Sequence, residues 1–172
     1  MVIDIIIKDF PMPVSVNKSM MPVMGKIKFN KNGKPYGSGR FVKTDLYKRF
    51  EAEALKWELS HKKGLESLKA DIIERRHELV KEGQELTLRV QYFAVFPKEK
   101  LITENNKLER RDADNLIKTC KDVLFKSLCL DDKHVFKDEI EKVVGTSEYM
   151  IIKITEYNPK EESTIKSLLG IK

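Results

Sequence analysis

Four stretches of the chain have the apolar patterning of β-strands. Residues 2–8 form a run of β-branched side chains, which predicts a buried strand. Residues 86–96 and 149–155 alternate apolar with polar positions, and this alternation predicts strands that bury one face. Residues 135–144 predict a further strand, joined to the last one by a turn near residues 146–147.

Three other stretches repeat their apolar residues at the helical period of 3.6. Residues 44–61 predict a helix capped by Thr44, and residues 65–81 predict a second helix, separated from the first by Gly64. Residues 115–128 predict a third helix with one apolar face. The apolar side chains on that face are Leu116, Ile117, Cys120, Val123, Leu124 and Leu128.

The order of these elements predicts the fold class. It indicates an α+β architecture, in which helices pack on a mixed or antiparallel sheet. We assign a single domain to residues 1–156, a length sufficient to bury a proper core. Residues 157–172 form a C-terminal tail whose pattern fits either a short helix or a partly disordered segment.

The cysteines and the hydropathy indicate the compartment. Cys120 and Cys129 lie on or just past one predicted helix, so we do not expect a disulfide, and this suits a reducing environment. The chain has no signal peptide and none of the roughly 18-residue apolar runs that a membrane span needs. The expectation is a soluble, cytoplasmic protein with no membrane partner.

The charge of the chain is concentrated near its N-terminus. The net charge is +6 with a pI near 9.1, which favours a polyanionic partner. Residues 26–43 predict a basic hairpin insertion with a turn at Asn32-Gly33. We expect this hairpin to hold DNA phosphates, and a solvated loop without a ligand is the alternative. Its candidate DNA-binding residues are Lys26, Lys28, Lys31, Lys34 and Arg40.

Acidic residues at the two ends of the third predicted helix are the candidate catalytic and metal-binding residues. Asp112 and Asp114 precede the helix, and Asp131 and Asp132 follow it. Carboxylates that converge repel one another unless a cation neutralises them, and Mg²⁺ prefers oxygen ligands. With Lys118 one turn after Asp114, the set suits metal-assisted phosphodiester hydrolysis. Two acids before a helix also commonly serve as a cap, so a purely structural role stays open.

Other uses of two closely spaced acids fit this sequence less well. An EF-hand that began at Asp112 would need an oxygen ligand and a glycine where Leu116 and Ile117 stand. A phosphoryl-aspartate enzyme carries its acids after a buried strand, whereas here Arg110 and Arg111 precede them. These two arginines either neutralise the acids or bind the phosphates that flank the scissile bond, and in a basic protein we favour DNA binding.

Two motifs occur in order along this part of the chain. They are R-D-A-D-N-L-I-K at residues 111–118 and L-D-D-K-H-V at residues 130–135, with Asp122 between them. This arrangement resembles the RusA family of Holliday-junction resolvases, which carries D-x-D-N-L-x-K, a helix and then D-D-x-x-V. A weaker similarity lies in F-P-M-P-V-S-V-N at residues 10–17.

The resemblance implies a function and assigns roles. It implies a homodimeric, Mg²⁺-dependent endonuclease that cuts four-way DNA junctions by paired symmetric nicks in recombination and repair, with Mn²⁺ as an alternative metal. By motif position the catalytic acids are Asp112, Asp114 and Asp132, and the essential lysine is Lys118. In the mechanism that we expect, Asp131 is a helper metal ligand. The competing hypotheses are a branched-DNA-binding protein that does not cut, and a nuclease for flaps or other branched DNA.

The length of the helix limits how the site is assembled. A helix over residues 115–128 would separate its ends by about 20 Å, whereas the link to Asp132 reaches back only about 13 Å. Asp132 therefore joins the acids before the helix within one chain only if the helix ends by about Lys126. Otherwise Asp132 of one protomer would complete the site of the other across a dimer axis. We favour the in-chain site because residues 127–129 make a poor helix end.

Overall fold

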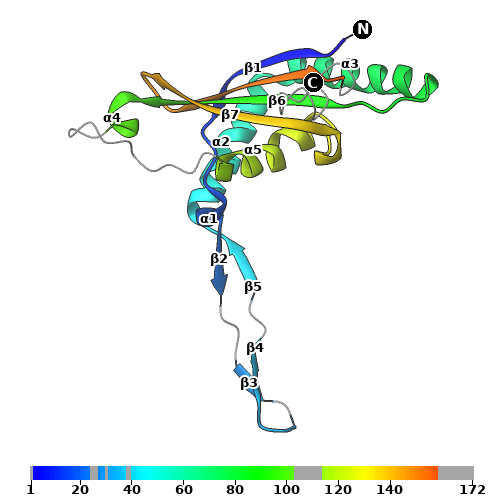
Figure 1. The fold of residues 1–172 in the computed structure, drawn as a ribbon. Helices are drawn as coiled ribbons and strands as arrows, with labels where there is room; N and C mark the ends of the chain where they lie inside the picture. The colour runs from blue at the N-terminus through cyan, green and yellow to red at the C-terminus, as the bar shows by residue number, and fades with distance from the viewer. Residues whose placement is uncertain (1, 24–26, 30, 38–39, 103–113, 159–172) are drawn as a thin grey trace, which may run out of the picture.

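A four-stranded mixed sheet is the centre of the fold. The computed structural model describes residues 2–23, 27–29, 31–37, 40–102 and 114–158 (Figure 1). The strand order in the sheet is β1-β8-β6-β7, and its strands are β1 (Asp4–Pro11), β6 (Leu88–Pro97), β7 (Val135–Gly145) and β8 (Tyr149–Glu156). Strand β8 pairs antiparallel with β1 and β6, while β6 and β7 are parallel. The predicted strands and the α+β class are confirmed.

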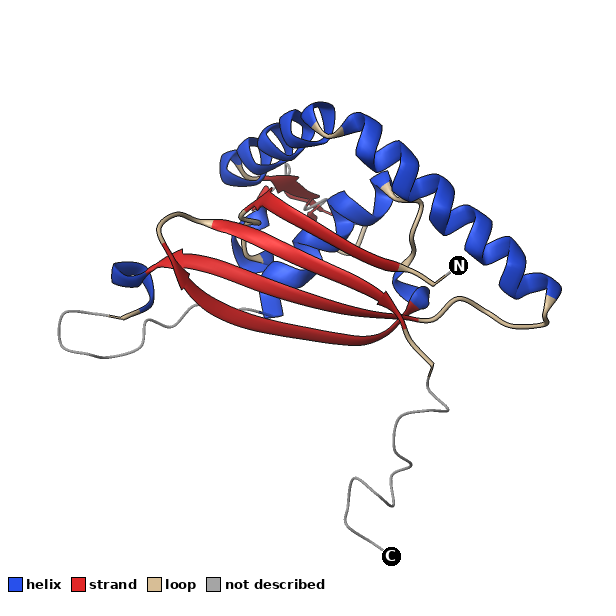
Figure 2. Cartoon of the chain, turned by 90° about the horizontal axis from the view of Figure 1, so that it is seen from above, coloured by secondary structure: helices blue, strands red, loops and turns tan. Residues whose placement is uncertain are grey.

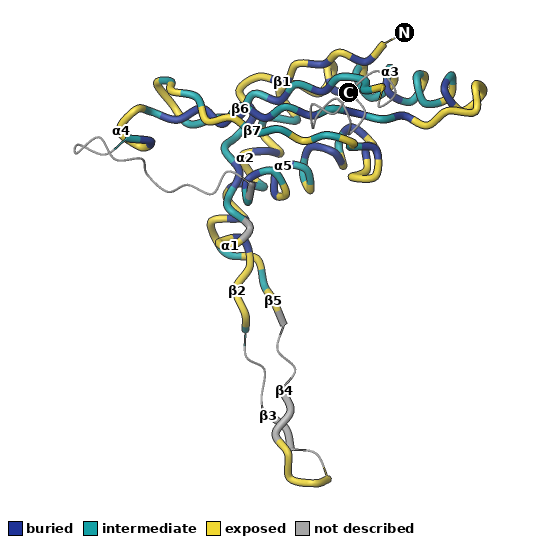
Figure 3. The backbone as a smooth tube through the Cα atoms, viewed as in Figure 1, coloured by how far each residue is buried: buried dark blue, intermediate teal, exposed yellow. Residues whose placement is uncertain are grey.

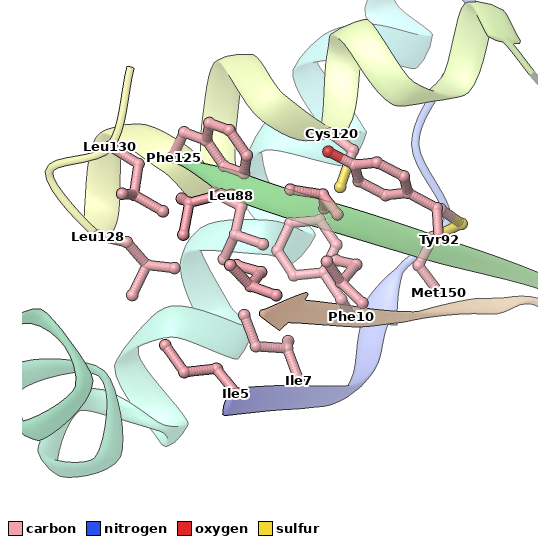
Figure 4. Packing of buried hydrophobic residues seen from close by; sticks show 14 of the residues in the cluster. Ile5, Ile7, Phe10, Leu88, Tyr92, Cys120, Phe125, Leu128, Leu130 and Met150 are labelled. Carbon is pink, nitrogen blue, oxygen red and sulfur yellow. The ribbon is translucent and has the colours of Figure 1, made fainter. Parts of the chain in front are cut away.

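The alternation of β6 explains its central place. Leu88, Val90, Tyr92, Ala94 and Phe96 are all buried on one face. Figure 4 places Leu88 and Tyr92 of β6 beside Phe125 and Cys120, which come from the helix α5 (Asp114–Ser127). Because α5 connects β6 to β7 as a crossover, the two strands can run parallel. The helix that carries the first motif is thus fixed against the centre of the sheet.

Two further helices, α2 (Asp45–Ser60) and α3 (Lys62–Lys81), follow each other almost without a break. Thr44 caps α2 as predicted, since its Oγ1 accepts the N–H of Tyr47 over 3.2 Å. The predicted break at Gly64 is wrong by three residues, because it occurs at His61. There the backbone of His61 leaves the helical conformation, with φ −108° and ψ 13°, and the Ser60 hydroxyl donates to the carbonyl of Trp57.

Figure 2 shows the helices gathered on one side of the sheet, seen from above. In the view of Figure 1, α2 and α5 lie beneath the sheet. Two short helices, α1 (Val16–Ser19) and α4 (Lys98–Leu101), lie near the edges of this body. Among the described helices, none is both long enough and apolar enough to cross a membrane. Cys120 is buried, Cys129 is exposed, and both are free thiols, as predicted.

An arm projects from the body on the side away from the sheet (Figures 1 and 3). It consists of two antiparallel pairs, and its turn contains Gly33 at φ 71°, a backbone conformation that glycine adopts readily. Of the predicted hairpin of residues 26–43, residues 27–29 and 35–37 form the outer pair, whereas residues 40–43 pair with residues 20–23 nearer the body. The arm's strands are β2 (Met20–Val23), β3 (Ile27–Phe29), β4 (Pro35–Gly37) and β5 (Arg40–Lys43), in which β2 pairs with β5 and β3 with β4.

Candidate active site

A pocket of about 390 Å³ opens between α5 and β7. It brings together Lys118 from α5 and Asp132 from the short 3-10 helix η1 (Asp132–His134), two of the four residues predicted to be catalytic. The described residues that line it are Ile117, Lys118, Lys121, Asp132, Asp138 and Ile140.

A left-handed turn after α5 explains how Asp132 reaches this pocket. Cys129 has φ 55°, which is uncommon for a residue other than glycine, and the N–H of Leu130 donates to the carbonyl of Phe125 over 2.9 Å. This turn reverses the chain and directs it back along the helix. As a result Oδ1 of Asp132 lies 3.9 Å from Nζ of Lys121, in the middle of α5.

This turn bears on the expected length of the helix. The in-chain site was predicted to need a helix that ends by about Lys126, and α5 ends one residue later, at Ser127. The reversal nevertheless starts immediately, so Asp132 lies beside Lys121 and lines the same pocket as Lys118. The arrangement of described residues therefore favours a site completed within one chain.

The acids of the first motif lie at or beyond the edge of the described chain. Asp114 is the first residue of α5, and its backbone alone is described. Asp112, Arg110 and Arg111 fall outside the described residues. Helix geometry places Lys118 one turn after Asp114 on the same face. The convergence of all four predicted catalytic residues stays a prediction.

The two adjacent acids at the other end of α5 differ in their surroundings. Oδ1 of Asp131 accepts the N–H of Lys133 over 3.1 Å, while the N–H of Asp131 donates to Nδ1 of His134 over 3.1 Å. This reciprocal pair is a capping box, which fixes the start of η1. Asp131 does not appear among the described residues that line the pocket. Its observed role is to hold the turn that presents Asp132, and its role as a helper metal ligand stays a prediction.

His134 takes part in that turn as a buried acceptor. Its side chain is 8% exposed, and burial lowers its pKa, with the positive charges of Arg76 and Lys133 acting in the same direction. A neutral ring leaves Nδ1 able to accept the amide of Asp131. His134 therefore stabilises the backbone next to Asp132 and does not line the pocket itself.

The structure adds Lys121 and Asp138 to the site, and the sequence patterns pointed to neither. Nζ of Lys121 lies 2.5 Å from Oδ2 of Asp138, and the Lys121 side chain is only 12% exposed. In the parallel register Asp138 pairs with the buried Val90, so its side chain is on the face of the sheet that α5 covers. The spacing of Lys121 from Lys118 was a usable signal, because residues three apart are neighbours on a helix. Asp122 lies instead in a different groove, with Tyr47 and Glu51.

The charges of the pocket determine how well it suits a dication. The carboxylates of Asp132 and Asp138 stand against the ammonium groups of Lys118 and Lys121, so the described part of the pocket is balanced. Within the described residues no three acids, histidines or cysteines gather closely enough to hold a metal. Oxygen ligands and an exposed Asp132 do suit Mg²⁺. The pocket therefore has a full set of ligands for Mg²⁺ only if Asp112 and Asp114 also line it.

Two other features of the protein lie apart from this pocket. A larger groove, of about 880 Å³, lies between β1 and the α2–α3 junction, but it contains none of the predicted catalytic residues. On the arm, Lys31 and Lys34 are exposed near the turn, whereas Lys26 and the side chains of Lys28 and Arg40 fall outside the described residues. The volume of a pocket alone thus does not identify the site, and the smaller pocket beside α5 is the one that contains predicted catalytic residues.

The protein is an α+β domain that has an acid-and-lysine pocket against its crossover helix. Comparison with family models gives a match to endodeoxyribonuclease RusA over residues 21–155. This range covers most of the chain, both motifs and the whole pocket, and the chain therefore belongs to the RusA family of endodeoxyribonucleases. A search of curated proteins found no match.

Proposed function

We propose that this protein is a Mg²⁺-dependent endonuclease that resolves four-way DNA junctions by paired symmetric nicks. Membership of the RusA family supports a nuclease that acts on branched DNA. The observation that carries the proposal for this chain is the pocket where Lys118 and Asp132 lie together beneath the sheet. A cytoplasmic role in DNA recombination and repair follows from this activity as part of the proposal.

Each residue of the site has a task in this proposal. Asp112, Asp114 and Asp132 would hold Mg²⁺ or Mn²⁺, with Asp131 as a helper. When bound, the metal activates a water molecule and polarises the scissile phosphate. The Lys118 ammonium is exposed at the pocket and stabilises negative charge that develops on the phosphate oxygens. The capped turn at Asp131 holds Asp132 at the pocket that Lys118 also lines, where its carboxylate would meet the metal.

Phosphate binding is assigned to the basic arm and to the loop before α5. The arm extends away from the body and carries Lys31 and Lys34 near its turn, which suits contact with a duplex beside the pocket (Figure 3). Such contacts supply affinity that does not depend on base sequence. Lys26, Lys28 and Arg40 extend the same basic stretch, and Arg110 and Arg111 would bind phosphates next to the cleaved bond.

A homodimer completes the proposal. Two sites related by a two-fold axis match a junction that itself has two-fold symmetry. We assign each site to one chain, because Asp132 lies beside Lys121 of the same chain. Lys121 is itself one helical turn from Lys118, which lines the same pocket. Mixing Asp112→Asn with Asp132→Asn subunits tests this assignment. Recovered cleavage in the heterodimer would instead indicate a site shared between protomers, provided that one intact site supports nicking.

The first experiment measures cleavage of a labelled mobile four-way junction with and without Mg²⁺. Duplex and flap substrates are the controls, and the Asp132→Asn variant is assayed beside the wild type. The expected result is paired nicks in the junction that need both the metal and Asp132. Equal cutting of flaps would favour a general branched-DNA nuclease. Junction binding without cutting in Mg²⁺ or Mn²⁺ would favour a binding protein and overturn the proposal.

A further inference from the structure

The ammonium of Lys121 lies between two carboxylates of the candidate site. It is 2.5 Å from Oδ2 of Asp138 and 3.9 Å from Oδ1 of Asp132. The side chain is 12% exposed, and Nζ lies 5.9 Å from the ring centre of the buried Phe125. The cation is therefore confined, and it has two anionic partners at different distances.

The two carboxylates are held in different ways. Asp138 belongs to β7, whose parallel register with β6 fixes its position, and its side chain is 31% exposed. Asp132 opens the single turn of η1, and its side chain is 71% exposed. Attraction between charges falls with distance, so the ammonium is held mainly by Asp138. Most of the oxygen lone pairs of Asp132 stay available to another cation.

We propose that Asp138 is a positioning residue that holds Lys121 away from Asp132 and so keeps Asp132 available to a divalent cation. The proposal rests on the assignment of Asp132 as a metal ligand. If Asp138 loses its charge, Asp132 is the remaining carboxylate among the described residues of the pocket, and the lysine ammonium shifts toward it. A direct Lys121–Asp132 ion pair then competes with the metal for the same oxygens.

Metal binding without DNA tests this competition directly. Binding of Mn²⁺ to the full-length protein is measured from the loss of the EPR signal of free Mn²⁺. The variants are Asp138→Asn, Lys121→Met and the double variant, with Asp132→Asn to identify the site. Glu139→Gln is the matched control, because it breaks the Glu139–Arg89 ion pair on the neighbouring position of β7, on the opposite face of the sheet.

The effect of Asp138→Asn on the Mn²⁺ affinity should depend on whether Lys121 is present. Asp138→Asn weakens Mn²⁺ binding by roughly three- to tenfold, as expected for a cation that moves by a few ångströms near a surface site. Lys121→Met does not weaken binding, since it removes the competing cation. In the Lys121→Met background the Asp138→Asn change has less than about a twofold effect. Glu139→Gln leaves the Mn²⁺ affinity unchanged.

Other outcomes separate the competing explanations. If Asp138→Asn weakens binding equally in both backgrounds, Asp138 acts on the metal itself, and the proposed positioning role is overturned. If the variants change only the melting temperature, the pair is a structural link, and the role is again overturned. A wild type with no Mn²⁺ site that depends on Asp132 would overturn the metal assignment of the proposed function. An Asp132-dependent site that ignores Asp138 and Lys121 would overturn this inference alone.

Discussion

The backbone N–H of Asp131 donates a 3.1 Å hydrogen bond to Nδ1 of His134, whose ring is buried. This bond requires an unprotonated Nδ1, and it holds the turn that presents Asp132 to the pocket. The local backbone of the candidate site is therefore linked to the protonation of one histidine. The link bears on the stability of the protein and on the separate roles of the two acids.

The stability of the protein should depend on pH through His134. Burial lowers its pKa in the folded state, so the unfolded chain, whose histidines titrate near 6.5, binds this proton more readily. The neutral ring therefore contributes stability above about pH 6.5, and this contribution is lost as the pH falls through the folded pKa. Urea unfolding between about pH 8 and pH 5 should show a smaller loss of stability in His134→Gln than in the wild type. The exposed His77→Gln is the control, and an unchanged slope in His134→Gln would contradict the assignment.

Substitutions of Asp131 and Asp132 should have different effects, because Asp131 has a structural role and Asp132 a functional one. Asp131→Ala removes the cap acceptor and should lower the free energy of unfolding by about 1 kcal/mol, with cleavage reduced only as far as the turn loosens. Asp132→Asn removes an exposed carboxylate with one distant cation, so it should leave stability within about 0.5 kcal/mol and abolish junction cleavage. Urea unfolding and single-turnover cleavage of the same preparations measure both quantities. The reverse pattern would exchange the roles of the two acids.

Lys118 should affect cleavage and not folding. Its side chain is exposed on α5 beside Asp132, so Lys118→Met should cost little stability. If its ammonium stabilises charge in the transition state, cleavage should fall by about 100-fold or more. Junction binding in Ca²⁺, measured by fluorescence anisotropy, should change by less than about threefold. Lys126→Met, on another face of the same helix, is the control, and an equal loss of activity there would remove the special role of Lys118.

Sequence patterns predicted the elements of this fold better than their contacts. The strand alternation of residues 86–96 and the helical period of residues 115–128 both correspond to real elements, because the core imposes these periods directly. The turn at Cys129 was not predictable, since neither glycine nor asparagine marks its left-handed conformation. The break lies at His61, whose backbone is not helical, while Gly64 lies inside α3, so the glycine did not mark the break.

The candidate site was predictable in part for a related reason. Lys118 and Asp132 belong to motifs whose order and spacing identify them, and the structure lines one pocket with both. The Lys121–Asp138 pair depends on the parallel register between β6 and β7, which places Asp138 on the helix-facing side of the sheet. Pairing between strands that are distant in sequence is not legible in a single chain. A residue whose role comes from such pairing is therefore found only in the structure.

The arm gives a prediction for DNA binding that is independent of catalysis. Replacing Lys31 and Lys34, which are exposed near the arm's turn, with alanine should weaken binding to junction and duplex alike. Removing one lysine–phosphate interaction should reduce the slope of log affinity against log salt concentration by about 0.9, so the double variant should reduce it by up to about 1.8. Salt titrations by fluorescence anisotropy measure this slope. The double variant Lys62→Ala and Lys63→Ala, at the start of α3, is the control for charge alone, and an equal change there would mean that the arm has no special role.

The hydroxyl of Tyr92 gives a prediction for the core. Tyr92 is 1% exposed on β6, and among the described residues its hydroxyl oxygen has no hydrogen-bond partner. Burial raises its pKa, with the nearby Cys120 acting in the same direction, so the group stays a protonated phenol. A buried hydroxyl without a partner costs free energy, so Tyr92→Phe should raise the free energy of unfolding by up to about 1 kcal/mol. Urea unfolding checks this. A decrease of more than about 1 kcal/mol would mean that the hydroxyl has a partner such as an ordered water, because only a satisfied group is costly to remove.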